Sequence, residues 1–357
     1  MPSFRSGKVV GVLQERVGLQ RVEVDLGDGP ERAYVLTQLT GDVHAGDRVV
    51  VNTTAVELGL GTGGWHVVHW NLERERWSER GPGHIIKSRY TSLQADVGSA
   101  EEHAAELVEV DDIAGMPVVA APLHSQVPAV AAGFKAAAPD ARLAYVMSDG
   151  AALPLALSDL VTAIRDRGLV DATVTYGHAF GGDYEAVSPH SALAVARHLA
   201  EVDAAVVAMG PGIVGTGTRL GFSGIEVGPV LDAASALGGR PIACLRASFA
   251  DPRPRHRGVS HHTLTTLRLA CRDRATVVVP AIGGHAEARL REDLTAAGIP
   301  DRHDVVGVDV PDVLDALGPG GLDVVSMGRP VADDPVLFQC AAAAGALAAR
   351  WVRSAPG

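Results

Sequence analysis

The rhythm of hydrophobic and polar positions divides the chain into two parts. In residues 1 to 75, five short segments alternate or run apolar between turn signals such as Gly27-Asp28-Gly29-Pro30. This pattern is typical of strands with one buried face. The segments are Lys8–Leu13, Gln20–Asp25, Arg32–Leu36, Arg48–Asn52 and His66–Trp70. They predict a small, closed, five-stranded β-barrel.

From Pro117 onward one unit repeats: an apolar strand, a loop rich in Gly, His, Asp or Ser, and a helix. The predicted strands are Val118–Ala121, Leu143–Met147, Ala172–Tyr176, Ala204–Met209, Ile242–Ala247, Thr276–Val279, Val305–Val308 and Asp323–Ser326. The predicted helices lie near 126–137, 155–167, 187–201, 224–238, 261–273, 285–297, 311–317 and 335–352. Such alternation predicts an α/β domain with a parallel sheet that is covered on both faces.

Two arrangements of these eight units are compatible with the pattern. We expect an open, doubly wound sheet, because the units differ in length and the third and fifth connections are long. A closed (β/α)8 barrel is the alternative. Both place a site in the loops that follow the strands. The domain prediction is therefore a β-barrel over 1–75, a linker over 76–116 with a helix near Glu101–Val110, and an α/β domain over 117–357.

Composition narrows the class of partner. The chain is 47% hydrophobic with a formal net charge of −11, and it has no long basic run. Only 4% of residues are aromatic, so stacking platforms for nucleic acid are scarce. We expect no nucleic-acid and no membrane partner, and an anionic small molecule in their place. A homo-oligomer is a further expectation.

Localisation follows from what the sequence lacks. No apolar run approaches the roughly 18 residues that span a bilayer. The first residues lack the apolar region of a signal peptide, and the three cysteines are far apart in apolar surroundings. Widely spaced, apolar cysteines are typical of buried residues in a reducing compartment. We therefore expect a cytoplasmic protein.

The segment Met209–Thr218 is the most informative in the chain. It leads from an apolar strand into a loop with four glycines and two threonines in ten residues. Backbone N–H groups in such a loop approach anions closely. It matches neither the Rossmann nor the Walker A spacing. We predict that it binds an oxyanion, and the alternative is a closely packed strand-to-helix connection. The predicted ligand residues are Gly210, Gly212, Gly215, Thr216, Gly217 and Thr218.

A second loop concentrates positive charge. Residues 246 to 257 hold four arginines against one aspartate, a local charge of +3. Because guanidinium groups suit carboxylate and phosphate, we predict that Arg253, Arg255 and Arg257 bind an anion. The alternative is a solvated surface loop. Arg329, after the last strand, is a further anion-binding candidate whose alternative is a salt bridge.

Four residues are candidates for moving protons: His261, His262, Asp251 and His178. Ser260 is placed to cap a helix whose first turn holds both His261 and His262, which favours neutral imidazoles. Adjacent helical residues diverge by about 100°, so one histidine at most points into a given site. The alternative is a solvent-facing pair.

Asp183 and Glu185 are the candidate metal ligands. Together with nearby histidines they offer oxygen and imidazole groups to Mg²⁺, Mn²⁺ or Zn²⁺, although their spacing matches no recognised metal motif. General acid–base use of these groups and helix capping by Asp183 are the alternatives.

Several strings in the chain also match a known family. They are Asn52–Val56, Leu60–Gly64, Gly181–Ala186, Gly210–Thr218, Arg255–Thr263 and Ser326–Arg329. On these strings the chain resembles, over nearly its whole length, a bacterial family defined by a domain of unknown function. That resemblance implies an N-terminal β-barrel followed by an α/β domain, and it implies no reaction, cofactor or catalytic residue.

These observations predict an enzyme that binds a phosphorylated or nucleotide-like small molecule at the sheet edge. Transfer or hydrolysis at phosphorus, with or without a metal, fits the predicted parts. The alternative is a non-catalytic protein for ligand sensing or assembly, whose glycine loop binds an anion without turnover.

Overall fold

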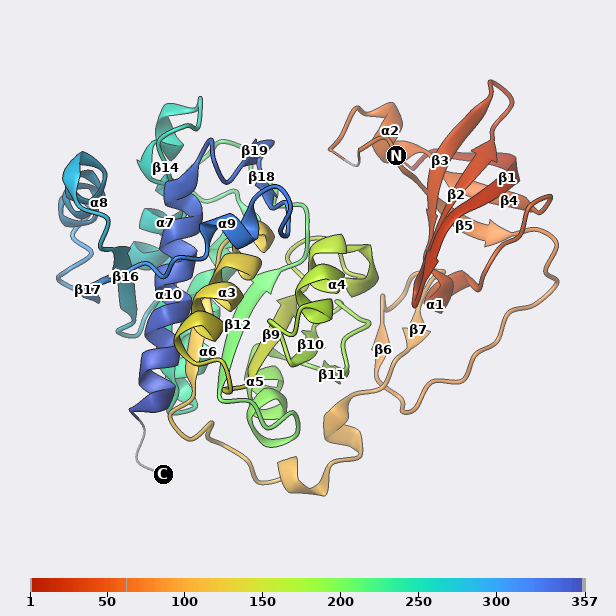
Figure 1. The fold of residues 1–357 in the computed structure, drawn as a ribbon. Coiled ribbons are helices and arrows are strands. Elements are labelled where there is room, and N and C mark those ends of the chain that lie inside the picture. Colours follow the sequence, from red (N-terminus) through yellow and green to blue (C-terminus); the bar gives the residue numbers. More distant parts are fainter. Residues whose placement is uncertain (1, 62, 355–357) are drawn as a thin grey trace. The chain divides into compact units, whose positions relative to one another are not determined.

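A computed structural model describes residues 2–61 and 63–354 of the chain (Figure 1). Met1, Thr62 and residues 355–357, which belong to the predicted domains and to the Leu60–Gly64 string, lie outside the described residues. The chain forms two compact units, Met1–Gly98 and Ser99–Gly357. The boundary between them falls inside the segment predicted as a linker.

The first unit is the closed five-stranded barrel that the alternation predicts. Its strands follow the order β1-β2-β3-β5-β4, with β3 and β5 parallel and the other pairs antiparallel. The strands are β1 (Phe4–Arg16), β2 (Leu19–Asp25), β3 (Pro30–Val35), β4 (Arg48–Asn52) and β5 (His66–Asn71). Shorter elements are α1 (Thr37–Thr40), α2 (Thr54–Glu57), β6 (Ile86–Lys87) and β7 (Ala95–Asp96). Inward valines such as Val22, Val35 and Val51 fill the barrel interior, because alternate residues of each strand face inward.

The second unit contains one eight-stranded parallel sheet in the order β11-β10-β9-β12-β8-β13-β16-β17. The strands are β8 (Pro117–Ala120), β9 (Leu143–Ser148), β10 (Ala172–Tyr176), β11 (Tyr184–Ala186), β12 (Ala204–Met209), β13 (Arg240–Ala243), β16 (Thr276–Pro280) and β17 (Asp304–Val308). The outermost strands, β11 and β17, do not pair with each other. The sheet is therefore open, which confirms the doubly wound prediction and removes the (β/α)8 alternative.

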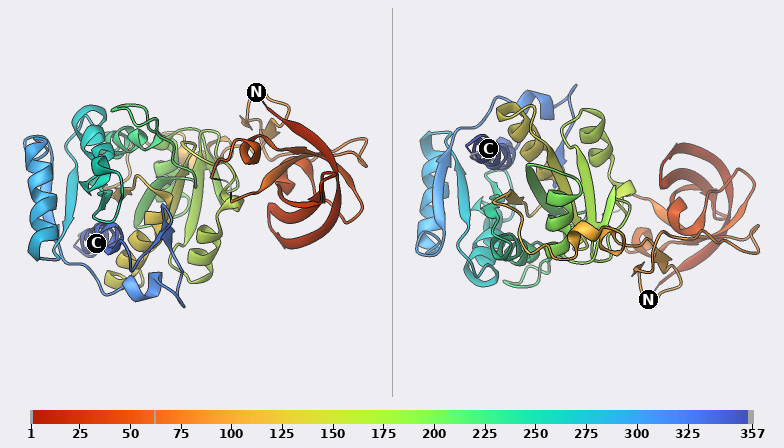
Figure 2. Two further views of the ribbon diagram at one scale, coloured as in Figure 1. Left: turned by 90° about the horizontal axis from the view of Figure 1, so that it is seen from above. Right: turned by 90° about the horizontal axis from the view of Figure 1, so that it is seen from below.

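Helices cover both faces of this sheet (Figure 2). One hydrophobic core joins the sheet to α3 (Val127–Ala137), α4 (Asp159–Asp166), α9 (Leu314–Leu317) and α10 (Pro335–Arg353). The core on the other face joins it to α5 (Pro189–His198), α6 (Val227–Ala236), α8 (Gly284–Ala296) and the helical segment His261–Ala270. In that segment α7 (His261–Thr265) continues as a π-helical turn, Thr266–Ala270. This unit also contains β14 (Ala247–Ser248), β15 (Gly258–Val259) and short 3₁₀ turns.

Helix α10 packs closely on α3 through small residues. A Cβ atom at Gly345 would lie 2.0 Å from the carbonyl oxygen of Val130, and one at Gly133 would lie 2.2 Å from that of Ala342. Among the described residues α10 alone is long and apolar enough to cross a membrane, and 72% of its apolar window is buried within the unit. Such burial is that of a core helix.

Two predicted elements differ from the structure. Asp323–Ser326 does not join the sheet: β18 (Val325–Ser326) forms a hairpin with β19 (Arg329–Pro330). Met327 and Gly328 have φ of 51° and 80°, the positive values that tight two-residue hairpin turns require. The eighth strand of the sheet is β11 instead.

The helix predicted near Glu101–Val110 is also wrong. Two 3₁₀ turns, Ala100–Glu102 and Ala105–Leu107, stand in its place. None of the residues 101 to 110 is buried, and a short helix without tertiary packing is marginal in water.

The order of the strands creates one favoured position for a site. After β8 the chain passes through α3 to β9, on one side, whereas after β13 it passes through α7 to β16, on the other. In open α/β sheets, ligands bind beyond the carboxyl ends of strands where the connections diverge in this way.

Candidate functional site

A pocket lies where the two predicted loops meet. It has a volume of about 150 Å³ and receives residues from the glycine loop, from the loop after β13 and from the β18–β19 turn. The lining residues are Ile213, Val214, Gly215, Gly217, Arg246, Arg253, Arg255, His256, His262 and Met327. We call this the first pocket. The structure thus brings together two loops that are about 40 residues apart in sequence.

The glycines of the loop after β12 serve different purposes. A Cβ at Gly210 would lie 2.3 Å from the carbonyl oxygen of Ala152, so that glycine permits close packing. Gly212 and Gly217 adopt φ of 106° and 82°, which favour glycine. Gly215 has neither constraint, and its missing side chain leaves the backbone open beside the His262 ring, with Cε1 3.6 Å from a Cβ built there. Of these four, Gly215 and Gly217 line the first pocket.

The two threonine hydroxyls close the glycine loop on itself. Thr216 Oγ1 lies 2.9 Å from Thr218 Oγ1 and 3.2 Å from the carbonyl oxygen of Gly221, to which it donates. Thr218 Oγ1 accepts from the Gly221 N–H at 3.1 Å. Neither threonine lines the first pocket. The structure therefore gives Thr216 and Thr218 a part in the shape of the loop.

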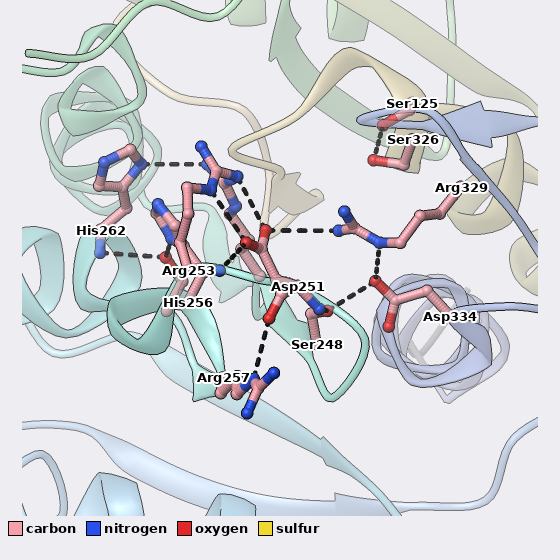
Figure 3. A network of polar contacts seen from close by, with 12 residues as sticks. Ser125, Ser248, Asp251, Arg253, His256, Arg257, His262, Ser326, Arg329 and Asp334 are labelled. Atoms are coloured by element: carbon pink, nitrogen blue, oxygen red, sulfur yellow. Dashed lines mark hydrogen bonds and ion pairs between the residues drawn. The ribbon is translucent and has the colours of Figure 1, made fainter. Parts of the chain in front are cut away.

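Asp251 organises the arginine loop (Figure 3). Its buried carboxylate accepts from Arg253 Nε at 2.9 Å and from Arg253 Nη2 at 2.8 Å, a bidentate pair. Arg257 Nε donates to the backbone oxygen of Asp251 at 3.0 Å. Hydrogen bonds from Arg253 hold the pKa of Asp251 well below its usual range. A carboxylate so stabilised is a poor proton acceptor, and its role here is to fix the direction of Arg253.

Arg329 belongs to the same network. Its Nε donates to Asp334 Oδ2 at 3.0 Å, and its Nη2 lies 3.4 Å from Asp251 Oδ2. Ser248 Oγ donates to the same Asp334 oxygen at 2.6 Å. The network ties the arginine loop to the start of α10 and to the β18–β19 hairpin. Arg329 and Arg257 do not line the first pocket, although both contact Asp251.

Arg246, which lies after β13 and directly before β14, was missed as an individual candidate. It is 4% exposed, and burial, followed by the charge of Arg253, lowers its pKa to about 10. It therefore keeps its charge at neutral pH. Its Nη1 lies 3.1 Å from Nδ1 of His262. Because arginine only donates, His262 Nδ1 accepts, and the ring proton of neutral His262 must reside on Nε2.

Three histidine rings stand side by side at the pocket. His256, His261 and His262 each offer a ring nitrogen, and these nitrogens lie within 4.8 Å of one another. Phe222 stacks on His262 with ring centroids 3.9 Å apart. Burial, followed by the charge of Arg246, lowers the pKa of both His256 and His262 to about 3. Burial and then Arg255 also lower the pKa of His261. All three imidazoles are neutral at pH 7.

This cluster suits an anion better than a cation. His262 Nε2 carries a proton, so it donates hydrogen bonds and cannot ligate a metal unless Arg246 moves away from Nδ1. Three arginines line the same pocket, and within the described residues no carboxylate does. Mg²⁺ and Mn²⁺ prefer oxygen ligands, so the donor set does not fit them. Zn²⁺ accepts imidazole, but would require the Arg246 contact to break.

The remaining predicted residues do not reach this pocket. Asp183 accepts from Thr173 N–H at 2.8 Å and pairs with Arg165 at 2.9 Å, toward the amino ends of β10 and β11. Glu185 accepts from Thr175 Oγ1 at 2.7 Å and from the Gly181 N–H at 2.6 Å. The carboxylates of Asp183 and Glu185 therefore accept hydrogen bonds at the β10–β11 edge of the sheet, and neither belongs to the histidine cluster.

His178 also lies elsewhere, in the loop after β10. Its backbone N–H donates to Asp149 Oδ2 at 3.0 Å. Near that loop the structure reveals a group that sequence reasoning missed. Burial and the negative charge of Asp149 raise the pKa of Glu226 to about 7, although a hydrogen bond from Ser148 opposes this rise. Ser148-Asp149, at the end of β9, was the available signal, but nothing in the sequence linked it to Glu226.

Comparison with known proteins gives one finding. A family model described as "Protein of unknown function (DUF3866)" matches residues 32–345, most of both units. No curated protein matches the chain. The match confirms the resemblance drawn from the sequence strings, and it adds no activity.

Proposed function

We propose that this chain, which belongs to that family of proteins of unknown function, binds a phosphate-bearing small molecule in the first pocket. The observation that carries the proposal is that three arginines, two histidines and an open glycine backbone line one small cavity. Phosphate oxygens are stabilised by guanidinium groups and by backbone N–H donors.

The charge balance around the pocket supports an anionic ligand. Arg246, Arg253 and Arg255 all line it, and the Asp251 carboxylate is already committed to Arg253. Arg255 is exposed and forms no ion pair or hydrogen bond within the described residues. Burial lowers the pKa of Arg246 most, and the like charges of Arg253 and Arg255 lower it further, because neighbouring cations repel one another. A bound phosphate would relieve that repulsion.

The catalytic form of the proposal is transfer or hydrolysis of a phosphoryl group in the cytoplasm. His262 would donate from Nε2 to a phosphate oxygen, because Arg246 fixes that tautomer. His256, whose Nδ1 lies 2.7 Å from Ser260 Oγ, keeps Nε2 for proton exchange with the reacting group. The arginines would stabilise negative charge that develops in the transition state.

A non-catalytic, ligand-sensing protein is the second candidate. The state of Asp251 favours it: this carboxylate, bonded to the lining residue Arg253, is held ionised by that arginine and is not free to accept a proton. Binding without turnover needs no such base. The two candidates share the first pocket and differ only in whether a product forms.

The test measures binding of inorganic phosphate to the full chain by calorimetry. Arg255→Ala should weaken the Kd about 10- to 100-fold, because a hydrogen bond to a charged group contributes about 1.5–3 kcal/mol. Gly215→Val should abolish binding, since the methyl groups of the introduced valine would fill the space beside His262. The matched control is Arg274→Ala, which removes an exposed arginine from the opposite end of the sheet, before β16.

Unchanged phosphate affinity in Arg255→Ala and Gly215→Val, with the fold intact by circular dichroism, would refute the proposed site. Release of phosphate from a panel of sugar phosphates and nucleotides then separates the two candidates. Binding that raises the melting temperature without any product would favour the sensing protein.

A further inference from the structure

A second pocket lies on the other side of the histidine rings. It has a volume of about 320 Å³ and is lined by Arg219, His261, Leu264, Thr265, Arg268 and Ala297. We call this the second pocket. Its residues come from the loop that continues from the glycines, from α7 with its π-helical extension, and from the end of α8.

The two pockets share a wall of imidazole. His261 lines the second pocket, and its neighbour His262 lines the first, because consecutive residues of a helix point about 100° apart. The ring centroid of His261 lies 4.4 Å from that of His262 and 5.0 Å from that of His256. The two pockets therefore lie next to each other at these rings.

The second pocket also carries uncommitted positive charge. Arg219 and Arg268 are exposed, and neither forms an ion pair or a hydrogen bond in the part of the chain that the structure describes. Arg253 and Arg329, by contrast, are held by buried aspartates. Because the chain carries a net charge of −11, arginines without acidic partners around two adjoining pockets make this part of the surface one that attracts anions.

His261 adds a polar group without a partner. Its Nε2 is buried and has no hydrogen-bond partner among the described residues. An unsatisfied buried nitrogen is costly, and a ligand oxygen is one way to satisfy it. Leu264 and Ala297 supply apolar surface to the same pocket, which suits the carbon skeleton of an organic ligand.

From this arrangement we infer that the ligand is a small organic molecule with two anionic groups. One group binds in the first pocket, and the second contacts Arg219, Arg268 and His261 in the second pocket. A bisphosphate, a diphosphate ester or a phosphorylated carboxylic acid meets this description. The inference rests on the proposed function and names the class of ligand that the site selects.

The experiment compares ligands that differ by one anionic group. Calorimetry on the full chain uses inorganic phosphate and two matched pairs: fructose 6-phosphate with fructose 1,6-bisphosphate, and AMP with ADP. In the wild-type protein, the doubly substituted member of at least one pair should bind about tenfold or more tightly than its partner. Arg219→Ala/Arg268→Ala should remove that advantage and leave the Kd of inorganic phosphate unchanged. Both residues are exposed, so the double variant should fold, and Arg274→Ala is the matched control.

The outcomes separate the two proposals. If phosphate binds but neither pair shows a preference, or if the preference survives in the double variant, the second pocket does not read an anionic group. If the double variant weakens inorganic phosphate as strongly as it weakens the preferred ligand, the two pockets are not distinct subsites. Failure of the wild-type protein to bind phosphate at all would refute the proposed function, and this inference with it.

Discussion

Asp251→Asn is the most direct test of how the arginine loop is built. The substitution keeps the size of the side chain and removes one negative charge. Asparagine retains one acceptor oxygen, but its amide N–H groups replace Oδ2. That oxygen lies 2.8 Å from Arg253 Nη2 and 3.4 Å from Arg329 Nη2, so donors then face donors. The bidentate pair is lost, and two guanidinium groups are left without that partner.

The expected cost follows from burial. Removing one partner of a buried ion pair costs about 3–5 kcal/mol. The Asp251 side chain is 1% exposed, but that of Arg253 is 36% exposed, so water recovers part of its interaction. We expect the free energy of unfolding to fall by about 2–3 kcal/mol. For a domain of this size, that corresponds to a melting temperature lower by roughly 4–12 °C.

The pH dependence gives a second readout. The folded-state pKa of Asp251 is depressed, so its contribution to stability is present above the pKa of about 3.9 that it has in the unfolded chain, and is lost as pH falls below that value. Thermal unfolding at pH 7, 5 and 3 should therefore show a constant difference between wild type and variant at pH 7 and 5, and a smaller one at pH 3. Asp304→Asn is the control, because its pair with Arg274 is exposed and contributes about 0.5 kcal/mol or less. A variant as stable as the wild type at pH 7, or a difference undiminished at pH 3, would refute this account of the loop.

Three further predictions concern other parts of the second unit. Gly345→Val should lower the free energy of unfolding by about 3 kcal/mol or more in urea titrations, because its Cβ would lie 2.0 Å from the Val130 carbonyl oxygen; no change would mean that α10 and α3 pack less closely. Sulfate, which does not titrate in this range, should bind with the same affinity from pH 8 to pH 5, because His256 and His262 have pKa values of about 3; a rise in affinity centred near pH 6.5 would show that a histidine becomes charged in the pocket. Zn²⁺ should leave the melting temperature unchanged, since the Arg246 contact places the proton on His262 Nε2; a clear increase that is lost in His262→Asn would assign the cluster to metal.

The sequence predicted the fold well where periodicity and burial agree. The strand Ala204–Met209 was predicted with its observed bounds, because six consecutive apolar residues between polar loops describe a strand buried on both faces. The strand predicted at Asp323–Ser326 was assigned to the sheet wrongly for a local reason: a two-residue turn at Met327-Gly328 pairs Val325–Ser326 with Arg329–Pro330 in a separate hairpin. No hydrophobic pattern contains that information.

The sequence identified the loops that form the candidate site, but not the role of each residue within them. The glycine loop and the arginine–histidine loop were identified from composition, and the parallel sheet brings both to one pocket. Asp183 was grouped with them because it also follows a strand, yet it turns back to Thr173 and pairs with Arg165. Arg246 and Glu226 gain their properties from burial, which composition does not reveal.

By itself, then, the sequence determined the elements, the parallel sheet and the two loops rich in glycine and in arginine, because propensity and periodicity are local properties of a chain. Tertiary structure alone decided which glycine lies open beside His262 and which described arginines are paired with aspartate. It also decided which pocket each of the two adjacent histidines faces. Those outcomes depend on distances between segments far apart in sequence and on exclusion of water from around charged groups. Only the folded chain fixes both.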